Sequence, residues 1–179
     1  NSIFIGLNGS FAPWVGALIT DLHQPILLIA PEGKEKEAVT RLSRVGYDNT
    51  LGYLKGGINA WEHTGKETDS IESIPADVFE KLYNKDLNIL DVRKPGEFEA
   101  EHLKTAASFP LDFISENMSQ IDKSKQYYVH CAGGYRSAIA ASILKARGFN
   151  NLVDLAGGFA TLKQTAIPKT NYVCPSTIK

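Results

Sequence analysis

An internal repeat limits the possible folds of this chain more than any other feature. The order of patterns along residues 26–61 returns along residues 127–159. Each half has a short apolar run typical of a buried strand, a glycine-containing loop, and an amphipathic helical stretch that ends at a glycine. A second apolar run and a Gly-Gly pair follow. Because the repeat is about one small domain long, it indicates a duplicated domain and not a solenoid.

Strands that alternate with helices predict an α/β fold with a mostly parallel sheet. The second half carries more at its front, including a buried strand at 87–92 and a short helix at 95–100 that the first half lacks. We therefore expect two copies of one fold, the first truncated at its N-terminus. A parallel sheet without its central strand exposes apolar surface and unpaired backbone groups. Either those elements were cut away or another chain covers the gap.

The repeat sets the predicted domain boundaries. Residues 1–65 form the partial copy, 66–73 a polar linker, 74–165 the complete copy and 166–179 a C-terminal tail. The first residue is Asn1 and not Met, which suits a piece of a longer protein. The predicted organisation is thus one complete domain and one incomplete domain.

Composition excludes several classes of protein. With 43% hydrophobic and 22% charged residues and a net charge of −1, the chain has no global field that recruits nucleic acid or an acidic membrane. Its longest apolar stretches are too short to span a bilayer, and no signal sequence opens it, so we expect a cytoplasmic protein. Two cysteines, Cys131 and Cys174, are no disulfide framework, and we favour free thiols over a bridge. The four histidines lack metal-ligand spacing, so no metal site is expected.

Cys131 stands where reactive chemistry is favoured. It follows an apolar strand, and the adjacent glycines allow successive N–H groups to form an anion-binding nest. A helix begins directly afterwards and adds positive charge at its N-terminus. We expect a cysteine there to be held partly as a thiolate, the reactive form, and a terminal persulfide to be held by the same groups. Arg136 adds a fixed cation suited to an anionic donor such as thiosulfate.

Four motifs, in the same order, resemble those of rhodanese-domain sulfurtransferases. Residues 130–137 (His-Cys-Ala-Gly-Gly-Tyr-Arg-Ser) look like the family's Cys-x-x-Gly-x-Arg-Ser loop. Residues 90–93 look like its Asp-x-Arg strand end. Residues 97–103 look like its Glu-aromatic-x-x-Gly-His-Ile segment, with Glu for the usual Gly, and residues 156–159 like its Gly-Gly-Trp, with Phe for Trp. The resemblance covers about 71–163.

The resemblance implies roles for the residues of these motifs. Cys131 would carry sulfur as a persulfide, assisted by Arg136. The substrate would contact the residues between them: Ala132, Gly133, Gly134 and Tyr135. Five further residues would support the loop from behind: Asp91, Arg93, Glu97, His102 and Ser137. Of these, Asp91 and Arg93 are expected to buttress the loop through hydrogen bonds.

The expected reaction moves sulfane sulfur from thiosulfate or a persulfide to a thiol acceptor, such as glutathione, through a Cys131 persulfide. Related phosphatases and arsenate reductases use a loop one residue longer, and Ser137 stands where their arginine would be. The other alternative is a non-catalytic docking or regulatory module of a metallo-β-lactamase-fold hydrolase, because the first copy has no cysteine in its loop, 30–34. Cys174 is expected to be an unremarkable exposed thiol, with a sulfur-accepting cysteine as the alternative.

Residues 8–16 resemble part of a larger architecture. In those proteins a metallo-β-lactamase-like persulfide dioxygenase precedes tandem rhodanese domains, the first of them inactive. The resemblance implies that this chain is the C-terminal part of such a fusion, acting in sulfide or persulfide detoxification. Iron would belong to the preceding domain, and this chain would hold no cofactor. The expected partners are a small sulfur donor and a thiol acceptor, without nucleic acid or membrane, and a homo-oligomer is left open.

Overall fold

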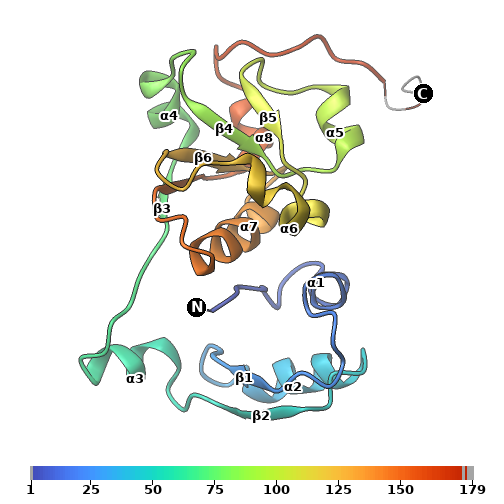
Figure 1. The fold of residues 1–179 in the computed structure, drawn as a ribbon, viewed down its shortest axis with the longest axis vertical. Helices are drawn as coiled ribbons and strands as arrows, with labels where there is room; N and C mark the ends of the chain where they lie inside the picture. Colours follow the sequence, from blue (N-terminus) through green and yellow to red (C-terminus); the bar gives the residue numbers. More distant parts are fainter. Residues whose placement is uncertain (1, 175, 177–179) are drawn as a thin grey trace. The chain divides into compact units, whose positions relative to one another are not determined.

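The computed structural model describes residues 2–174 and 176. These residues fold as two units, each of which is described by itself (Figure 1). Unit 1 runs from Ile71 onward and takes in the first residues up to Phe4, whereas unit 2 is Ile5–Ser70. No helix in the described part of the chain is both long and apolar enough to cross a membrane.

Within the described residues, unit 1 is built on a parallel sheet of five strands in the order β3-β7-β6-β4-β5. The strands are β3 (Glu72–Ile74), β4 (Asn88–Asp91), β5 (Ala106–Ser108), β6 (Tyr127–His130) and β7 (Leu152–Leu155). All four residues of the central strand β6 are buried, as expected of a parallel sheet with both faces covered. The predicted α/β fold with a parallel sheet is confirmed for this unit.

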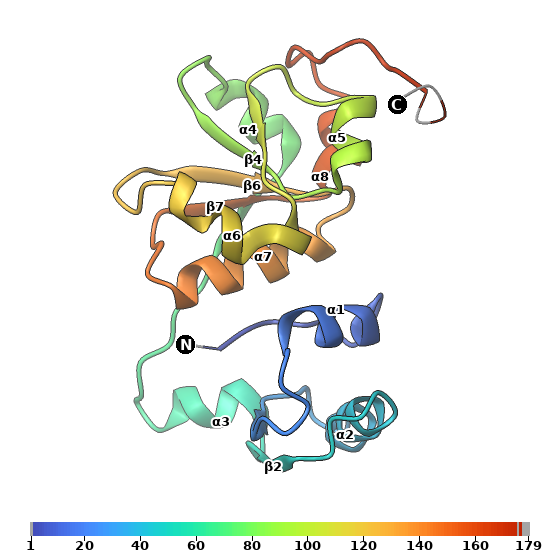
Figure 2. The ribbon, with the colours of Figure 1, turned by 45° about the vertical axis from the view of Figure 1, so that its right-hand side comes forward.

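Helices lie on both faces of this sheet (Figures 1 and 2). One face carries α4 (Ala76–Leu82) and α8 (Gly158–Leu162), and the other carries α6 (Ile114–Asn117) and α7 (Tyr135–Ala146). A short helix, α5 (Pro95–Ala100), follows β4. Two 3₁₀ turns flank α6, at Leu111–Phe113 and Met118–Gln120.

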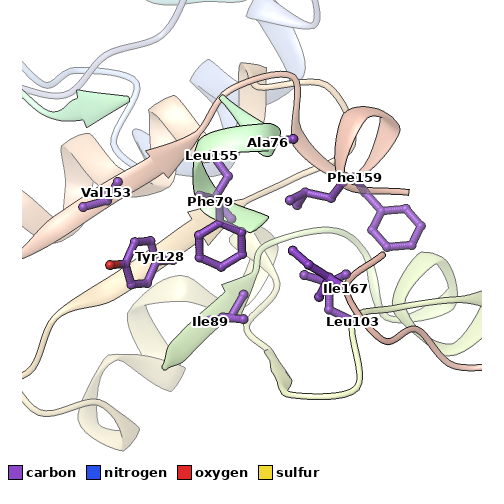
Figure 3. Close-up of a cluster of buried hydrophobic side chains, with 10 residues drawn as sticks. Ala76, Phe79, Ile89, Leu103, Tyr128, Val153, Leu155, Phe159 and Ile167 are labelled. Atoms are coloured by element: carbon purple, nitrogen blue, oxygen red, sulfur yellow. The ribbon is translucent and has the colours of Figure 1, made fainter. Parts of the chain in front are cut away.

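The core of unit 1 lies between the sheet and the helices α4 and α8 (Figure 3). Phe79 of α4 is fully buried, and its ring centroid lies 4.9 Å from that of Tyr128 on β6. Val153 and Leu155 of β7 belong to the same cluster. Because residues two apart in a strand face the same side, Tyr128 and His130 both point toward this core. The core therefore extends along β6 to the residue before Cys131.

The boundaries of unit 1 differ from the predicted ones at its front. Residues 66–73 were expected to be a linker, but Glu72 and Ser73 belong to β3, which pairs in parallel with β7. Ser73 Oγ also donates a hydrogen bond to Asp154 Oδ2 at 2.8 Å. The polar composition of this segment does not prevent pairing, because β3 is an edge strand with two exposed residues.

The predicted tail also differs, because its first part belongs to the fold. Ile167 is only 2% exposed and lies in the core of unit 1. Backbone hydrogen bonds tie the segment to residues 100–104: Lys104 N to Pro168 O (3.0 Å), Thr170 N to His102 O (2.9 Å) and Val173 N to Ala100 O (2.8 Å). Residues 175 and 177–179 lie outside the described residues. Sequence patterns do not reveal such pairing, since it has no periodicity.

Unit 2 is smaller. Within the described residues its sheet has two parallel strands, β1 (Ile26–Leu28) and β2 (Thr50–Tyr53). Its helices are α1 (Phe11–Leu18), α2 (Glu35–Ser43) and α3 (Gly57–His63). The core of unit 2 consists of Phe11, Val15, Leu42 and Tyr47, with Ile26 and Leu28 packed against it.

The order β1-α2-β2-α3 in unit 2 matches the order β6-α7-β7-α8 in unit 1. The backbone repeats in detail as well. Ile26 N donates to Asn49 O at 3.0 Å, and Tyr127 N donates to Asn151 O at 2.9 Å. After α2 and after α7 the chain turns at a glycine with φ of 90°: Gly46 and Gly148.

Candidate active site

Cys131 lies between the end of β6 and the start of α7, at the carboxyl edge of the central strand. Its side chain is only 1% exposed. The Gly134 N–H donates a hydrogen bond to Cys131 Sγ at 3.1 Å. Gly134 has φ of 100°, a left-handed conformation that favours glycine. The loop thus folds back over the sulfur, which lies at the N-terminal end of α7, where the helix dipole is positive.

The start of α8 holds the loop from behind. Phe159 N donates to Cys131 O at 2.7 Å, and Ala160 N donates to Ala132 O at 3.0 Å. This approach requires Gly158, because a Cβ there would lie 2.4 Å from Cys131 O. The Gly-Gly-Phe motif therefore fixes the backbone of the cysteine loop.

Arg136 forms a bidentate ion pair with Glu97 of α5. The Nη1–Oε2 distance is 2.6 Å and the Nη2–Oε1 distance is 2.8 Å. Lys94 N also donates to Glu97 Oε2, at 3.1 Å. The hydrogen bond from Arg136 lowers the pKa of Glu97, and the bond to Glu97 raises the pKa of Arg136. Both groups are therefore charged at neutral pH.

This ion pair changes the predicted roles of two residues. Arg136 was expected to offer a cation to an anionic donor, and Glu97 to support the loop from a distance. In the structure the charge of Arg136 is compensated by the carboxylate of Glu97. The physical reason is the sheet order: β4 is the neighbour of β6, so α5, which follows β4, lies beside the cysteine loop.

Asp91 and Arg93 form a buried ion pair, with exposed fractions of 0% and 5%. Arg93 Nη2 lies 2.5 Å from Asp91 Oδ2 and donates to Glu101 O at 2.8 Å. The guanidinium carbon lies 4.0 Å from the centroid of the Phe159 ring. Asp91 and Arg93 were expected to support the loop through hydrogen bonds. In the structure Arg93 supports it indirectly, because it packs on Phe159, whose N–H donates to Cys131 O.

His130, directly before Cys131, is fully buried. Its Nδ1 lies 3.3 Å from Cys131 O, and its Nε2 lies 3.8 Å from Asp91 Oδ2. Burial lowers the pKa of His130, and the charge of Asp91 opposes this only in part. The ring is therefore neutral at pH 7 and adds no positive charge beside the cysteine.

His102 and Ser137, the other predicted supports, lie in different places. Ser137 is buried in the first turn of α7, and its Oγ donates to Gly134 O at 3.1 Å. It therefore does support the loop. His102 stacks on Phe98 with ring centroids 3.7 Å apart, and its Nδ1 lies 2.6 Å from Phe98 O. His102 thus fixes the end of α5.

The predicted substrate contacts form the outer side of the loop. Gly133 is exposed, and Ala132, Gly134 and Tyr135 are half-buried. Cys131 is buried beneath them, and Cys174 is exposed. A hydrogen bond with Ser176 lowers the pKa of Cys174.

The chain belongs to the rhodanese-like domain family, whose model matches residues 75–165. It is 31% identical over 106 residues to "Putative sulfur carrier protein YrkF" of Bacillus subtilis, covering 58% of this chain and 55% of that protein. It is 32% identical over 87 residues to "Thiosulfate sulfurtransferase GlpE" of Coxiella burnetii, covering 49% of this chain and 81% of that one. The crystal structure of the Alr3790 protein from Anabaena superimposes with a TM-score of 0.50 at 26% identity, covering 56% and 94% of the two chains.

Proposed function

We propose that unit 1 is a sulfurtransferase in which Cys131 carries the transferred sulfur. One observation carries the proposal: Cys131 is buried at the N-terminal end of α7, and its Sγ accepts a hydrogen bond from the Gly134 N–H. These are the groups that stabilise a sulfur anion, whether a thiolate or the outer sulfur of a persulfide. The family and the names of the relatives agree with this chemistry.

The reaction has two half-reactions. The Cys131 thiolate attacks the sulfane sulfur of the donor, a new S–S bond forms, and the old S–S bond breaks. The electron pair leaves with sulfite if the donor is thiosulfate, and with a thiolate if it is a persulfide. In the second half-reaction, the thiolate of the acceptor takes the outer sulfur, and Cys131 leaves as a thiolate. No external oxidant or reductant is needed.

Substitution of the nucleophile tests the proposal. Cys131→Ser should abolish thiosulfate:thiol sulfurtransferase activity, because a serine hydroxyl cannot form the persulfide. Cys174→Ser, a matched change at the exposed cysteine, should keep the activity of the wild-type protein. Full activity in Cys131→Ser would refute the proposed role, and equal loss in both variants would point to sulfur relay between the cysteines.

We also propose that unit 2 is a second, partial copy of the rhodanese fold without a nucleophile. A Cβ on Gly57 would lie 2.9 Å from Ala30 O, just as one on Gly158 would meet Cys131 O. Ala30 thus takes the position of Cys131. The repeated element order supports the proposal.

The exposure of equivalent residues supports the view that this copy is partial. Leu27 and Leu51 are 76% and 65% exposed, whereas their equivalents Tyr128 and Val153 are 7% and 4% exposed. In unit 1 those positions pack against Phe79 of α4 and Ile89 of β4. Unit 2 has no counterpart of these two elements among the described residues. The fusion of this chain to a metallo-β-lactamase-like domain and its location in the cytoplasm stay predictions.

A further inference from the structure

The cysteine loop offers little uncompensated positive charge to a substrate. The positions between Cys131 and Arg136 hold no charged side chain. Arg136 has both terminal nitrogens on the carboxylate of Glu97. Arg93, whose guanidinium lies over the Phe159 ring, is paired with Asp91. The stabilisation of a sulfur anion therefore falls on backbone N–H groups, of which Gly134 N–H already contacts Cys131 Sγ.

Glu97 itself is held firmly for this task. Its Oε2 accepts from Arg136 Nη1 and from Lys94 N, and its Oε1 accepts from Arg136 Nη2. The ion pair is mostly shielded on the arginine side, where the side chain is 17% exposed, and less so on the glutamate side, at 37%. A bidentate pair of this kind fixes the guanidinium in one orientation. Arg136 thus has a carboxylate as its partner before any donor arrives.

The two classes of donor place different charges in this loop. Thiosulfate brings two negative charges to a Cys131 thiolate that already carries one. Two charges leave with sulfite, and the new Cys131 persulfide keeps one. A persulfide brings at most one negative charge, and none when it is protonated as R–S–SH: the thiolate then takes its outer sulfur and proton, and R–S⁻ leaves with the electron pair. Like charges at contact distance repel strongly in a half-buried site. A loop without net positive charge therefore disfavours thiosulfate.

We propose that Glu97 is a positioning residue that sets donor specificity: by neutralising Arg136, it makes the Cys131 loop select persulfide donors over thiosulfate. This inference rests on the proposed sulfur-carrying role of Cys131. Glu97 acts through Arg136 and does not touch the donor. Removing its charge frees the arginine to pair with the sulfonate group of thiosulfate.

The test measures the first half-reaction alone. The full chain is mixed with thiosulfate or with cysteine persulfide, without acceptor, and the persulfide on Cys131 is followed over time by mass spectrometry. The wild-type protein should react faster with cysteine persulfide. Glu97→Gln should raise the ratio of the thiosulfate to the persulfide rate constant about tenfold, equal to about 1.4 kcal/mol. Its thiosulfate rate should also fall more steeply with added salt than that of the wild-type protein.

Two variants serve as controls. Glu97→Asp keeps the negative charge on a shorter side chain and should bring the ratio back from that of Glu97→Gln toward the wild-type value. Glu99→Gln removes a charge from the exposed side of the same helix and should keep the wild-type ratio. A ratio unchanged in Glu97→Gln, an equal rise in Glu99→Gln, or a wild-type preference for thiosulfate would each overturn the inference. If neither donor places sulfur on Cys131 of the wild-type protein, it is the proposed function that fails.

Discussion

At the scale of single residues, the cysteine loop depends most directly on Gly158, because no side chain fits at this position. Its φ is 57°, and a Cβ would come within 2.9 Å of the Cys131 and Ala132 carbonyl carbons as well as 2.4 Å of Cys131 O. Backbone atoms cannot move aside as a flexible side chain can. The contact holds Phe159 N on the cysteine carbonyl, so a change here acts on the site and on stability together.

Gly158→Ala should therefore lower the free energy of unfolding by about 3 kcal/mol and reduce sulfur transfer. Gly133→Ala is the matched control, because nothing lies within 4 Å of a Cβ at that loop position. It should cost less than about 0.5 kcal/mol. Urea unfolding followed by circular dichroism measures both. Equal effects of the two variants would show that α8 does not hold the loop.

The buried His130 predicts a pH dependence of stability. Burial lowers its pKa in the folded state below its ordinary value of 6.5. Between the two pKa values the unfolded chain binds a proton that the folded chain does not, so the free energy of unfolding falls as pH drops below about 6.5 and levels off above it. His130→Gln should flatten this dependence below about pH 6.5. An unchanged slope in that variant would contradict a buried neutral imidazole.

Single residues also mark the limit of sequence reasoning. The spacing of the loop residues pointed to Cys131 as the nucleophile. The pairing of Arg136 with Glu97 could not be foreseen, because it joins residues 39 positions apart and depends on β4 lying next to β6. Strand order is a property of the whole sheet and leaves no periodic trace in the sequence.

At the scale of elements, apolar runs and glycine stops predicted most of the strands and helices. The run at 87–92 became β4 (Asn88–Asp91), and the stretch at 95–100 became α5 (Pro95–Ala100). The segment after 165 was expected to lie outside the fold, yet Ile167 is in the core. Its position is fixed by backbone bonds to residues 100–104, which any side chains permit.

Equivalent positions in strands β1 and β6 test the proposal that unit 2 is a partial copy of the fold of unit 1. Tyr128→Ala should cost unit 1 about 3–5 kcal/mol, because Tyr128 packs in its core. Leu27→Ala, at the equivalent exposed position, should change unit 2 by less than about 0.5 kcal/mol. Both tryptophans, Trp14 and Trp61, lie in unit 2, so their fluorescence reports its unfolding separately from that of unit 1. A large fall in the free energy of unfolding of unit 2 in Leu27→Ala would mean that this face of β1 is covered in solution.

At the scale of the whole molecule, the two units carry different features. Unit 1 holds the family match, the five-stranded sheet of the described residues and the cysteine loop. In the proposed partial copy, unit 2, Ala30 stands in the place of the cysteine. Any sulfur transfer by a loop of this kind therefore depends on Cys131, and the role of unit 2 must be sought elsewhere than in that chemistry.

Locating the sulfur that a donor leaves on the protein tests the proposed role of Cys131 most directly. After treatment with thiosulfate or cysteine persulfide and removal of excess donor, the peptide that contains Cys131 should be heavier by about 32 Da, the mass of one sulfur atom. A small thiol should remove this mass, and Cys131→Ser should never acquire it. Added sulfur found only at Cys174, or at neither cysteine, would contradict the proposal that Cys131 is the sulfur carrier.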